Sequence, residues 1–600
     1  MRVPVGRGSR VAIVLGRSKG DFEGEIREIA GPIDACPLLP SATLELLRWF
    51  SETYLCGIGS TAKTLLPSGF MAGQEIDLGR KKGEPPAAEG FRGIAGREAS
   101  GRAGDVAFLY EPEDELRLAQ YAAMLADELP TLVSFPLYPA AKRFYETLLS
   151  SDALSEDLKK RMTLFPRSGA KAEWRTWSRL LAMDEASIVI GGQSSAMAPL
   201  RGLSRVIVED ESNNIWRTVR APIYNVRSLL AKRAQLEGAA LVLGGRMPSS
   251  RAFAQAEKTP AVRHTEDGRP LGRTVFVDLR LAYAPSVKGV CDTLAVSEPL
   301  VRETESVLSR GAWVLWLLDR KGYAGEVLCE ECGVTVTCDR CGGAMRWEAA
   351  RARLRCVVCS EARTVPENCP VCGGRLLTAK RPGLEALLPL ARAAINAGVP
   401  ILLHGDDEED PAVESSLRES SGLLLGTRAA LAACDRLRVG LVSWLDADGE
   451  ARSQDYDAKA RAFGLMWESR WRGLDPAGRT LVLQSRRPGR EWQKGLEDAR
   501  SGWHVFWRKE LAERSEFGMP PYNALVRVDC PPSEIAAISD RLGDAFEYWV
   551  SEGDGAPRPA RSSIWIRTLK IGELRRTLAP FFHIKRAGRR GYPGITVWHD

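Results

Sequence analysis

Eight of the thirteen cysteines stand close together in the middle of the chain, and their spacing is that of metal ligands. They form four Cys-x2-Cys pairs between Cys329 and Cys372, with 5, 14 and 9 residues between successive pairs. Each pair can present two thiolates to one tetrahedral ion, so eight thiolates suit two closed, structural Zn(Cys)4 sites. None of the five histidines lies inside the block, which argues against an open catalytic metal position. A disulfide framework is the alternative, and it would require an oxidising compartment.

The predicted ligands are Cys329, Cys332, Cys338, Cys341, Cys356, Cys359, Cys369 and Cys372. Spacing alone leaves open which of them share an ion. The other cysteines are scattered singles, and we interpret them as small core residues.

The C-terminal segment is a second place where residue types suggest chemistry. Ten Lys and Arg residues lie between Ala556 and Trp598, opposed by a single acid, Glu573, whereas the whole chain has a net charge of only +6. A basic segment on a nearly neutral body predicts a polyanion partner such as nucleic acid, although a solvated basic surface gives the same pattern. The densest basic run supplies the candidate DNA contacts Lys585, Arg586, Arg589 and Arg590.

Several domains must position these residues, because 600 residues exceed what one hydrophobic core holds. The hydrophobic content of 44% and the charged content of 27% exclude a disordered or fibrous chain. Apolar runs such as Ala312–Leu318 are far shorter than the roughly 20 residues of a membrane helix. The first residues lack the layout of a signal peptide, so we expect a cytoplasmic protein.

After residue 105, strand-like apolar runs alternate with helical patterns. The expected strands are Val106–Tyr110, Thr131–Phe135, Ser187–Gly191, Val206–Val208 and Ala240–Leu243, and the expected helices are Leu116–Leu129, Ala140–Leu149 and Tyr224–Leu236. Such alternation predicts a doubly wound parallel sheet. A second alternating stretch runs from Pro299 to Gln484, around the cysteine block. Before them we expect a strand at Arg10–Leu15 and a helix at Thr43–Phe50, followed by a Gly- and Pro-rich linker over residues 71–104.

Several motifs together resemble the family of the replication restart (primosome assembly) protein PriA. The run Arg320-Lys-Gly-Tyr-Ala-Gly325 before the cysteine block resembles that family's NRRGYAP segment, and all four cysteine pairs keep the family's spacing. Leu445-Asp-Ala-Asp-Gly449 resembles its LDxDG motif, and Glu513-Arg514 with Pro520-Pro521-Tyr522 resembles its ER and PPW/Y motifs. Ile188-Val-Ile-Gly191 resembles the start of its IVIGTRSALFAPL strand.

The resemblance implies a multidomain α/β fold with two degenerate helicase-like (RecA-like) parallel-sheet lobes, a double-zinc insertion, a β-rich N-terminal domain and an α+β C-terminal domain. The implied parts are a truncated 3′-DNA-end-binding-like domain at 1–70, the linker at 71–104, lobe 1 at 105–292, lobe 2 at 293–328 and 378–490, the zinc module at 329–377 and a basic DNA-binding domain at 491–600. The resemblance also implies nested zinc ligands. One set is Cys329, Cys332, Cys369 and Cys372, and the other is Cys338, Cys341, Cys356 and Cys359.

The nucleotide-binding motifs of the family are degenerate in this sequence. A phosphate loop needs glycines, free amides and one Lys, whereas the strand Val106–Leu109 is followed by Tyr110-Glu-Pro-Glu-Asp-Glu115. We expect these four acids to repel a triphosphate, and no G-x-x-x-x-G-K-[ST] occurs elsewhere in the chain. The D-E-E-H motif becomes Glu209-Asp-Glu-Ser212, whose carboxylates leave Mg²⁺ binding or a solvated strand end as alternatives.

Two further motor motifs have also changed. Gly244-Gly-Arg-Met-Pro248 stands in place of G-S-A-T-P, and no arginine finger is in register near Trp467. We interpret the neighbouring Arg470 and Arg472 as surface charge. Four degenerate elements together predict that the ATPase is lost while the two-lobe frame remains.

The N-terminus keeps part of the family pattern. Arg2-Val-Pro-Val-Gly6 resembles the family's VRVPFG, and Gly6 and Arg27 match positions that line its 3′-end pocket, so they are carried over as DNA contacts. The preceding family segment with a Phe-Asp pair is missing, so either the start is assigned late or the pocket is incomplete. The winged-helix module of the family looks deleted, since only the 71–104 linker stands in its place.

Three functions follow as hypotheses. The leading one is a PriA-like protein that binds forked, branched or 3′-ended DNA and helps primosome assembly and reloading of the replicative helicase, with two structural zinc ions and without ATPase activity. Single-stranded-DNA-binding protein and the helicase-loading machinery are the partners that the resemblance implies. The alternatives are an ATP-dependent 3′-to-5′ helicase with an unconventional nucleotide site, and a zinc-dependent protein-interaction scaffold.

Overall fold

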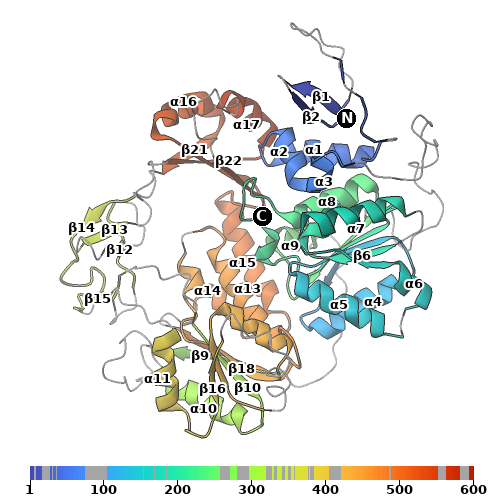
Figure 1. Cartoon of the computed structure of the whole chain (residues 1–600). Helices are drawn as coiled ribbons and strands as arrows, with labels where there is room; N and C mark the ends of the chain where they lie inside the picture. Colours follow the sequence, from blue (N-terminus) through green and yellow to red (C-terminus); the bar gives the residue numbers. More distant parts are fainter. Residues whose placement is uncertain are drawn as a thin grey trace.

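The computed structural model spans the whole chain (Figure 1). It describes residues 1–5, 8–16, 28–29, 31–34, 37–74, 105–152, 154–167, 169–183, 187–256, 271–279, 296–318, 327–329, 331, 334–340, 345–348, 353–356, 359–375, 377–378, 384–404, 420–453, 455–485, 488–551, 562–581 and 594–599.

Lobe 1 is built on a six-stranded parallel sheet of order β3-β8-β7-β4-β6-β5. Its strands are β3 (Val106–Tyr110), β4 (Thr131–Ser134), β5 (Met162–Leu164), β6 (Ile188–Gly191), β7 (Arg205–Val208) and β8 (Ala240–Gly245). Its helices are α4 (Asp114–Leu125), α5 (Tyr138–Ser150), α6 (Glu156–Arg161), α7 (Ala170–Ala182), α8 (Val226–Glu237) and α9 (Ser250–Ala256), with short 3-10 turns at η1 (Gln193–Met197) and η2 (Asn214–Trp216).

Both faces of this sheet are covered, which explains why its strands are continuous apolar runs. Along β4, Val133 packs in the core beneath α4, α5 and α6, whereas Leu132 packs in the core on the side of α7 and α8. The predicted doubly wound sheet is therefore confirmed. Helix α4 ends at Leu125 rather than at the predicted Leu129, because Glu128 turns the chain with a φ of +58°.

Lobe 2 repeats this plan with a parallel sheet of order β16-β17-β10-β18-β19-β9. Its strands are β9 (Thr274–Asp278), β10 (Trp313–Leu317), β16 (Ile401–Leu403), β17 (Leu423–Gly426), β18 (Val439–Trp444) and β19 (Thr480–Ser485). Its helices are α10 (Glu298–Leu308), α11 (Leu384–Ala394) and α13 (Ala458–Trp471), with η4 (Arg428–Asp435) and η5 (Glu450–Arg452). Strand β9 lies inside the range 105–292 that we assigned to lobe 1, yet it pairs in parallel with β19. That boundary was wrong for β9, because strand pairing across the chain places it in the second sheet.

The N-terminal region supplies a hairpin of β1 (Arg2–Val5) and β2 (Gly8–Val11), followed by α1 (Ser41–Thr53), α2 (Ile58–Leu65) and α3 (Ser68–Met71). Helix α1 buries Leu46, Leu47 and Phe50 against α8 of lobe 1, and the three helices lie on top of that lobe in Figure 1. The described part of this region is thus more helical than the β-rich unit we expected. The linker residues 75–104 lie outside the described residues.

A short helix and a long one join lobe 2 to the last domain. Helices α14 (Glu491–Lys494) and α15 (Gly502–Glu516) pack against α13 and α9. The range 491–600 assigned to the C-terminal domain therefore begins with helices that belong to the packing between the lobes.

The C-terminal domain is a four-stranded antiparallel sheet covered on one face by two helices. Its elements run β20 (Ala524–Cys530), α16 (Pro532–Leu542), η6 (Gly543–Ala545), β21 (Glu547–Ser551), β22 (Ser562–Thr568), α17 (Ile571–Leu578), η7 (Ala579–Phe581) and β23 (Gly594–Trp598). The strand order β21-β22-β20-β23 with this β-α-β-β-α-β sequence is the ferredoxin-like arrangement. The predicted α+β domain is confirmed.

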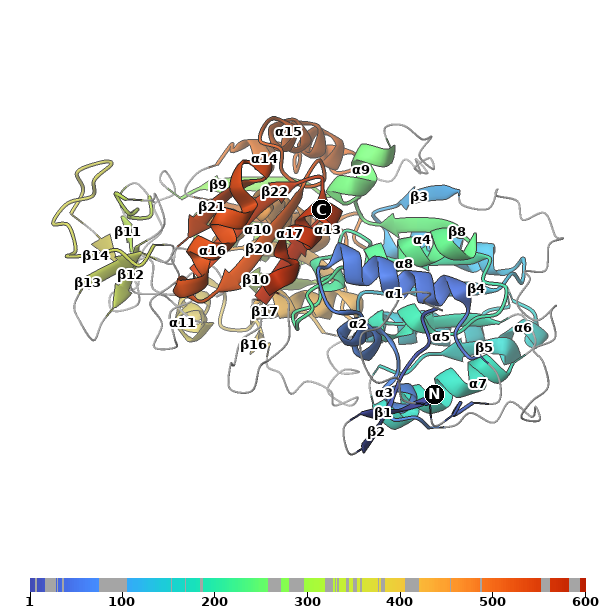
Figure 2. The ribbon, with the colours of Figure 1, turned by 90° about the horizontal axis from the view of Figure 1, so that it is seen from above.

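The cysteine block forms a separate small module that projects from the left of the molecule in both Figure 1 and Figure 2. Its short strands are β11 (Leu328–Cys329), β12 (Met345–Glu348), β13 (Arg353–Cys356), β14 (Ala362–Arg363) and β15 (Leu377–Thr378). Among the helices formed by the described residues, none is long and apolar enough to cross a bilayer.

Candidate functional site

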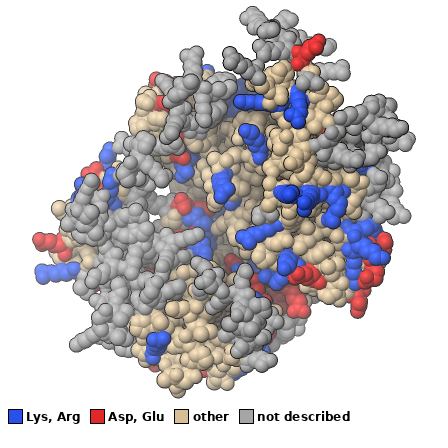
Figure 3. All heavy atoms as spheres, in the orientation of Figure 1, with Lys and Arg blue, Asp and Glu red and all other residues tan. Residues whose placement is uncertain are grey.

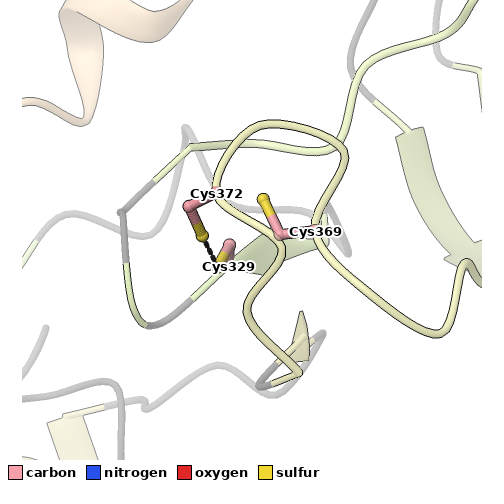
Figure 4. A group of neighbouring side chains, drawn as sticks. All are labelled: Cys329, Cys369 and Cys372. Atoms are coloured by element: carbon pink, nitrogen blue, oxygen red, sulfur yellow. Dashed lines mark hydrogen bonds between the residues drawn. The ribbon is translucent and has the colours of Figure 1, made fainter.

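Three cysteines from the two ends of the module meet at one point (Figure 4). The sulfur atoms of Cys329, Cys369 and Cys372 lie within 4.8 Å of one another, and the Sγ atoms of Cys329 and Cys372 are 3.5 Å apart. Two tetrahedral Zn–S bonds of about 2.3 Å would separate their sulfurs by about 3.8 Å, whereas a disulfide would need about 2.0 Å. The spacing therefore fits ligands around one ion rather than a covalent bond.

Local backbone geometry prepares this group for a metal. The pairing of β11 with β15 places Cys329 opposite Leu377, close to the turn that carries the other two cysteines. In that turn the amide of Val371 donates to the Sγ of Cys369 at 3.4 Å, and the amide of Gly374 donates to the Sγ of Cys372 at 3.4 Å. Such N–H···S bonds favour the thiolate, which is the form that binds metal.

A second group of three cysteines lies in the inner part of the module. Cys338, Cys356 and Cys359 also have their sulfurs within 4.8 Å of one another, and those of Cys338 and Cys359 are 3.6 Å apart. The amide of Cys359 donates to the Sγ of Cys356 at 3.5 Å. Antiparallel pairing of β12, β13 and β14 holds this group together.

The two groups divide the cysteines as the nested arrangement does, not in sequential order. Cys329 joins the last pair of the block, and Cys338 joins the third pair. Cys332 and Cys341, the fourth predicted ligand of each site, lie outside the described residues. Each described group supplies three thiolates of like charge, and this donor set fits zinc.

The part of lobe 1 where the resemblance places a degenerate nucleotide site contains a network of largely buried ion pairs. At its centre Arg117 is fully buried on α4, and its guanidinium donates to both carboxylate oxygens of Glu209 at 2.6 to 3.1 Å. The same guanidinium donates to Asp114 at 2.6 Å and to the backbone carbonyl of Glu111. The hydroxyl of Tyr121 adds a fourth contact to Glu209 at 2.9 Å.

Each of the three carboxylates that replace the metal-binding motif has its own arginine. Arg117 forms an ion pair with Glu209 at 2.6 Å, Arg246 pairs with Asp210 at 3.2 Å, and Arg227 pairs with Glu211 at 2.7 Å. Glu211 also accepts from the hydroxyl of Tyr110 at 2.9 Å and from the amide of Ser249 at 2.6 Å. All three acids are therefore held by donors of the same chain; Glu209 and Glu211 are buried, and Asp210 is partly exposed.

The start of α4 is where a phosphate loop would place its amides. Here the first turn carries Asp114 and Glu115, so its own carboxylates complement the positive end of the helix. Asp114 also pairs with Arg246 at 2.6 Å. Our expectation of four repelling acids was therefore incomplete, because Asp114 forms ion pairs with two arginines, Arg117 and Arg246.

Burial and charge shift the pKa values of this network in opposite directions. Burial raises the pKa of the Asp114 carboxyl, but Arg246 and Arg117 outweigh it and hold that pKa well below its ordinary value. Burial, reinforced by Glu209, raises the pKa of Tyr121 well above that of an exposed tyrosine. Asp114 is therefore charged and Tyr121 neutral at pH 7, which suits the hydrogen bonds they make.

Direct contacts also hold the two lobes together at this place. The indole of Trp467 donates to the carbonyl of Arg246 at 2.9 Å, and that of Trp507 donates to the carbonyl of Pro248 at 2.9 Å. The amide of Gly473 donates to Asp114 at 3.2 Å. One hydrophobic core continues from the N-terminal helices through both lobes into the C-terminal domain. A cleft of about 510 Å³ remains between the lobes.

The interpretation of Arg470 and Arg472 as surface charge was wrong. Arg470 is 2% exposed and donates to Thr274 and to the carbonyl of Gly272, so it fastens α13 to β9. Arg472 forms ion pairs with Asp435 and Glu468. Both arginines hold lobe 2 together, because their guanidinium groups satisfy carbonyls and acids that the fold buries.

The candidate DNA contacts Gly6, Arg27, Lys585, Arg586, Arg589 and Arg590 lie outside the described residues and stay predictions. Sequence reasoning missed the arginine partners of the buried acids. The i,i+3 spacing of Asp114 and Arg117 on a helix was a signal for one of these pairs. The pairs that involve Glu209, Asp210 and Glu211 join segments that are distant in the sequence, so no local sequence pattern predicts them.

Comparison with known proteins agrees with the sequence motifs. Residues 1–67 match the family model of the PriA 3′DNA-binding domain (3′BD). The replication restart protein PriA of Treponema pallidum (strain Nichols) is 24% identical over 567 residues, which cover 87% of this chain and 81% of that protein. The chain is similar to PriA proteins over most of its length. This confirms the resemblance inferred from the cysteine block and the helicase motifs.

Other PriA relatives align over a smaller part. The PriA of Bacillus subtilis (strain 168) is 24% identical over 374 residues, which cover 61% of this chain and less than half, 45%, of that protein. Among solved structures, the DUF1998 helicase MrfA bound to DNA and AMPPNP is 14% identical, with a TM-score of 0.34, over 69% of this chain and 49% of that one.

Proposed function

We propose that this protein is a DNA-binding, two-zinc relative of PriA that recognises forked, branched or 3′-ended DNA without hydrolysing ATP. The observation that carries the proposal is the buried ion-pair network at the degenerate nucleotide site. Arg117, Arg246 and Arg227 take the carboxylates that a motor would use for Mg²⁺, and the start of α4 is closed by acids. Opening this site to a nucleotide would expose buried charges without partners, which is costly.

DNA as the ligand is supported by the match of residues 1–67 to a 3′DNA-binding domain and by the charge of the surface. In Figure 3, Lys and Arg side chains are spread over lobe 1 and the N-terminal helices. Phosphate contacts of this kind give affinity that falls with salt. Bound zinc would serve as a structural brace, since the cysteine groups are made of thiolates alone.

The place of action in the cell is part of the same proposal. A protein of this kind would act in the cytoplasm, where replication forks are repaired and restarted. It would cooperate with single-stranded-DNA-binding protein and with the machinery that loads the replicative helicase. These partners rest on the resemblance to PriA.

The test is ATP hydrolysis measured with and without forked DNA, with DNA binding followed in parallel on protein of verified zinc content. We expect salt-dependent binding of forked DNA and no hydrolysis above the rate measured without protein. DNA-stimulated hydrolysis by the wild-type chain would overturn the loss of the motor. Absence of binding to forked, 3′-ended and single-stranded DNA would overturn the DNA-binding role.

A further inference from the structure

The outer face of the C-terminal sheet carries three tryptophans in a row. Trp549 on β21 is directly opposite Trp565 on β22, and their rings are parallel to within 2° with centroids 6.2 Å apart. The ring of Trp598 on β23 follows at 5.5 Å from Trp565 with an interplanar angle of 24°. We call this row the tryptophan ladder. Helices α16 and α17 cover the opposite face of the sheet (Figure 1).

Strand alternation separates the ladder from the core of the domain. In β22 every second residue is buried, so Ile564 and Ile566 face the helices while Trp565 and Arg567 point outward. The core already contains Ile564, Ile566, Ile538, Leu542, Leu574 and Leu578. The tryptophans are therefore not required to fill it, and Trp549 is 41% exposed.

Arginines are interleaved with the rings. The guanidinium of Arg527 lies 5.5 Å from the centroid of Trp565 and 5.7 Å from that of Trp598, and the guanidinium of Arg217 lies 4.4 Å from Trp598. The acids on this face among the described residues are Asp529, which pairs with Arg527 at 3.1 Å, and Glu547, which pairs with Arg567. Within the described part of the chain no carboxylate forms an ion pair with Arg217. The face is thus aromatic with an excess of positive charge.

One end of the tryptophan ladder lies next to the cleft between the lobes. Arg217 covers its inner end at Trp598 and lines the cleft of about 510 Å³ between the lobes. The same wall carries Arg428 and Arg461, which both pair with Glu450, and Arg514, which pairs with Glu510. The outer end at Trp549 faces solvent. A row of aromatic rings and guanidinium groups therefore connects the exposed edge of the C-terminal sheet with the cleft between the lobes.

We propose that the tryptophan ladder is a stacking platform for the bases of single-stranded DNA, with Arg527 and Arg217 beside the backbone phosphates. Four-stranded sheets with outward aromatic residues bind single strands in this way, since every base offers a π-face and duplex bases are already stacked on one another. Trp549, the most exposed ring, would take the first base. This inference rests on the proposed DNA binding and adds a site apart from the basic run at residues 585–590.

The test compares the full chain with W549A, W549F and the neighbouring control V550A, whose side chain is similarly exposed at 42%. Binding of a labelled oligothymidylate of about 16 nucleotides, a matched duplex and an oligouridylate is measured by fluorescence anisotropy. We expect W549A to bind oligothymidylate about tenfold more weakly, W549F to keep most of the affinity and V550A to equal wild type. Binding of the duplex should change little in all three variants.

A crosslinking measurement on the wild-type chain keeps the test independent of any folding defect in a variant. Ultraviolet crosslinking of oligothymidylate that contains 5-iodouracil should label a peptide with Trp549 or Trp565. Unchanged affinity of W549A together with crosslinks that avoid both tryptophans would overturn the platform while DNA binding stands. Tighter binding of oligouridylate would overturn the assignment to DNA, and failure of the wild type to bind any DNA would overturn the proposed function as well.

Discussion

The cysteine module and the ion-pair network of lobe 1 both gather ionisable groups from distant parts of the chain, but only the network contains the opposite charges as well. In the module, each group brings together three cysteines, which as thiolates carry like charges. In lobe 1, Glu209, Asp210 and Glu211 each face an arginine of the same chain. The first arrangement could be neutralised by a bound metal cation, whereas the second has its opposite charges within the chain.

The surroundings of the two sites strengthen this difference. The apolar core of the module has six buried members among the described residues, two of which are the cysteines Cys338 and Cys356. Lobe 1 has large apolar cores on both faces of its sheet. A bound metal would stabilise a region with so small a core, while a lobe with two cores can hold a buried ion-pair network in place.

Removing a metal ligand should have the largest effect. C369S takes one thiolate from a site whose zinc contributes on the order of 10 kcal/mol to folding. We expect the zinc content to fall from about two ions per chain to about one, with faster proteolysis inside residues 327–378 and little change elsewhere. Metal analysis and limited proteolysis measure both effects. The matched control is C56S, which removes a half-buried single cysteine. Full zinc content in C369S would contradict the assignment of Cys369 as a metal ligand.

Breaking the central ion pair of lobe 1 should have the next largest effect. R117M leaves Glu209 buried without its arginine, which should lower the free energy of unfolding by about 3–5 kcal/mol. The double variant R117M/E209L should recover much of that loss, because the orphaned charge is then gone. Urea unfolding compares these variants with K142A, which removes an exposed pair with Glu146 and should cost less than about 1 kcal/mol. Equal stability of R117M and K142A would show that the network is not structural.

The smallest effect expected is a pH dependence from Asp114. Its pKa is lower in the folded protein than the value of about 3.9 in an unfolded chain, so its charge stabilises the fold above that value. This contribution is lost as the pH falls from about 4 toward the lower folded pKa. D114N should therefore be less stable than wild type at pH 7, and the difference should shrink in acid. Because acid releases zinc from both proteins, only the difference between them in urea unfolding is interpreted, and a difference that grows in acid would reject this sign.

Much of the framework followed from the sequence because its signals are local. The run Val106–Tyr110 became β3 with the same bounds, and the spacing of the cysteine pairs anticipated two groups of ligands. Strand alternation and Cys-x2-Cys turns depend on neighbouring residues, which a sequence displays directly. The loss of the phosphate loop was likewise visible at Tyr110–Glu115.

The sequence could not show the tertiary contacts that each side chain makes. It showed three carboxylates at Glu209–Glu211 but not that Arg117, Arg227 and Arg246 would meet them, and it suggested surface charge for Arg470, which is buried. Likewise, Trp549, Trp565 and Trp598 come from three strands and form a row only after the sheet is paired. By itself the sequence determined most of the elements and the cysteine pairs that meet in two groups, because these depend on residue type and short spacing. The tertiary structure decided which charges are neutralised within the chain and which rings share a face, because pairing across many residues is set by packing rather than by local pattern.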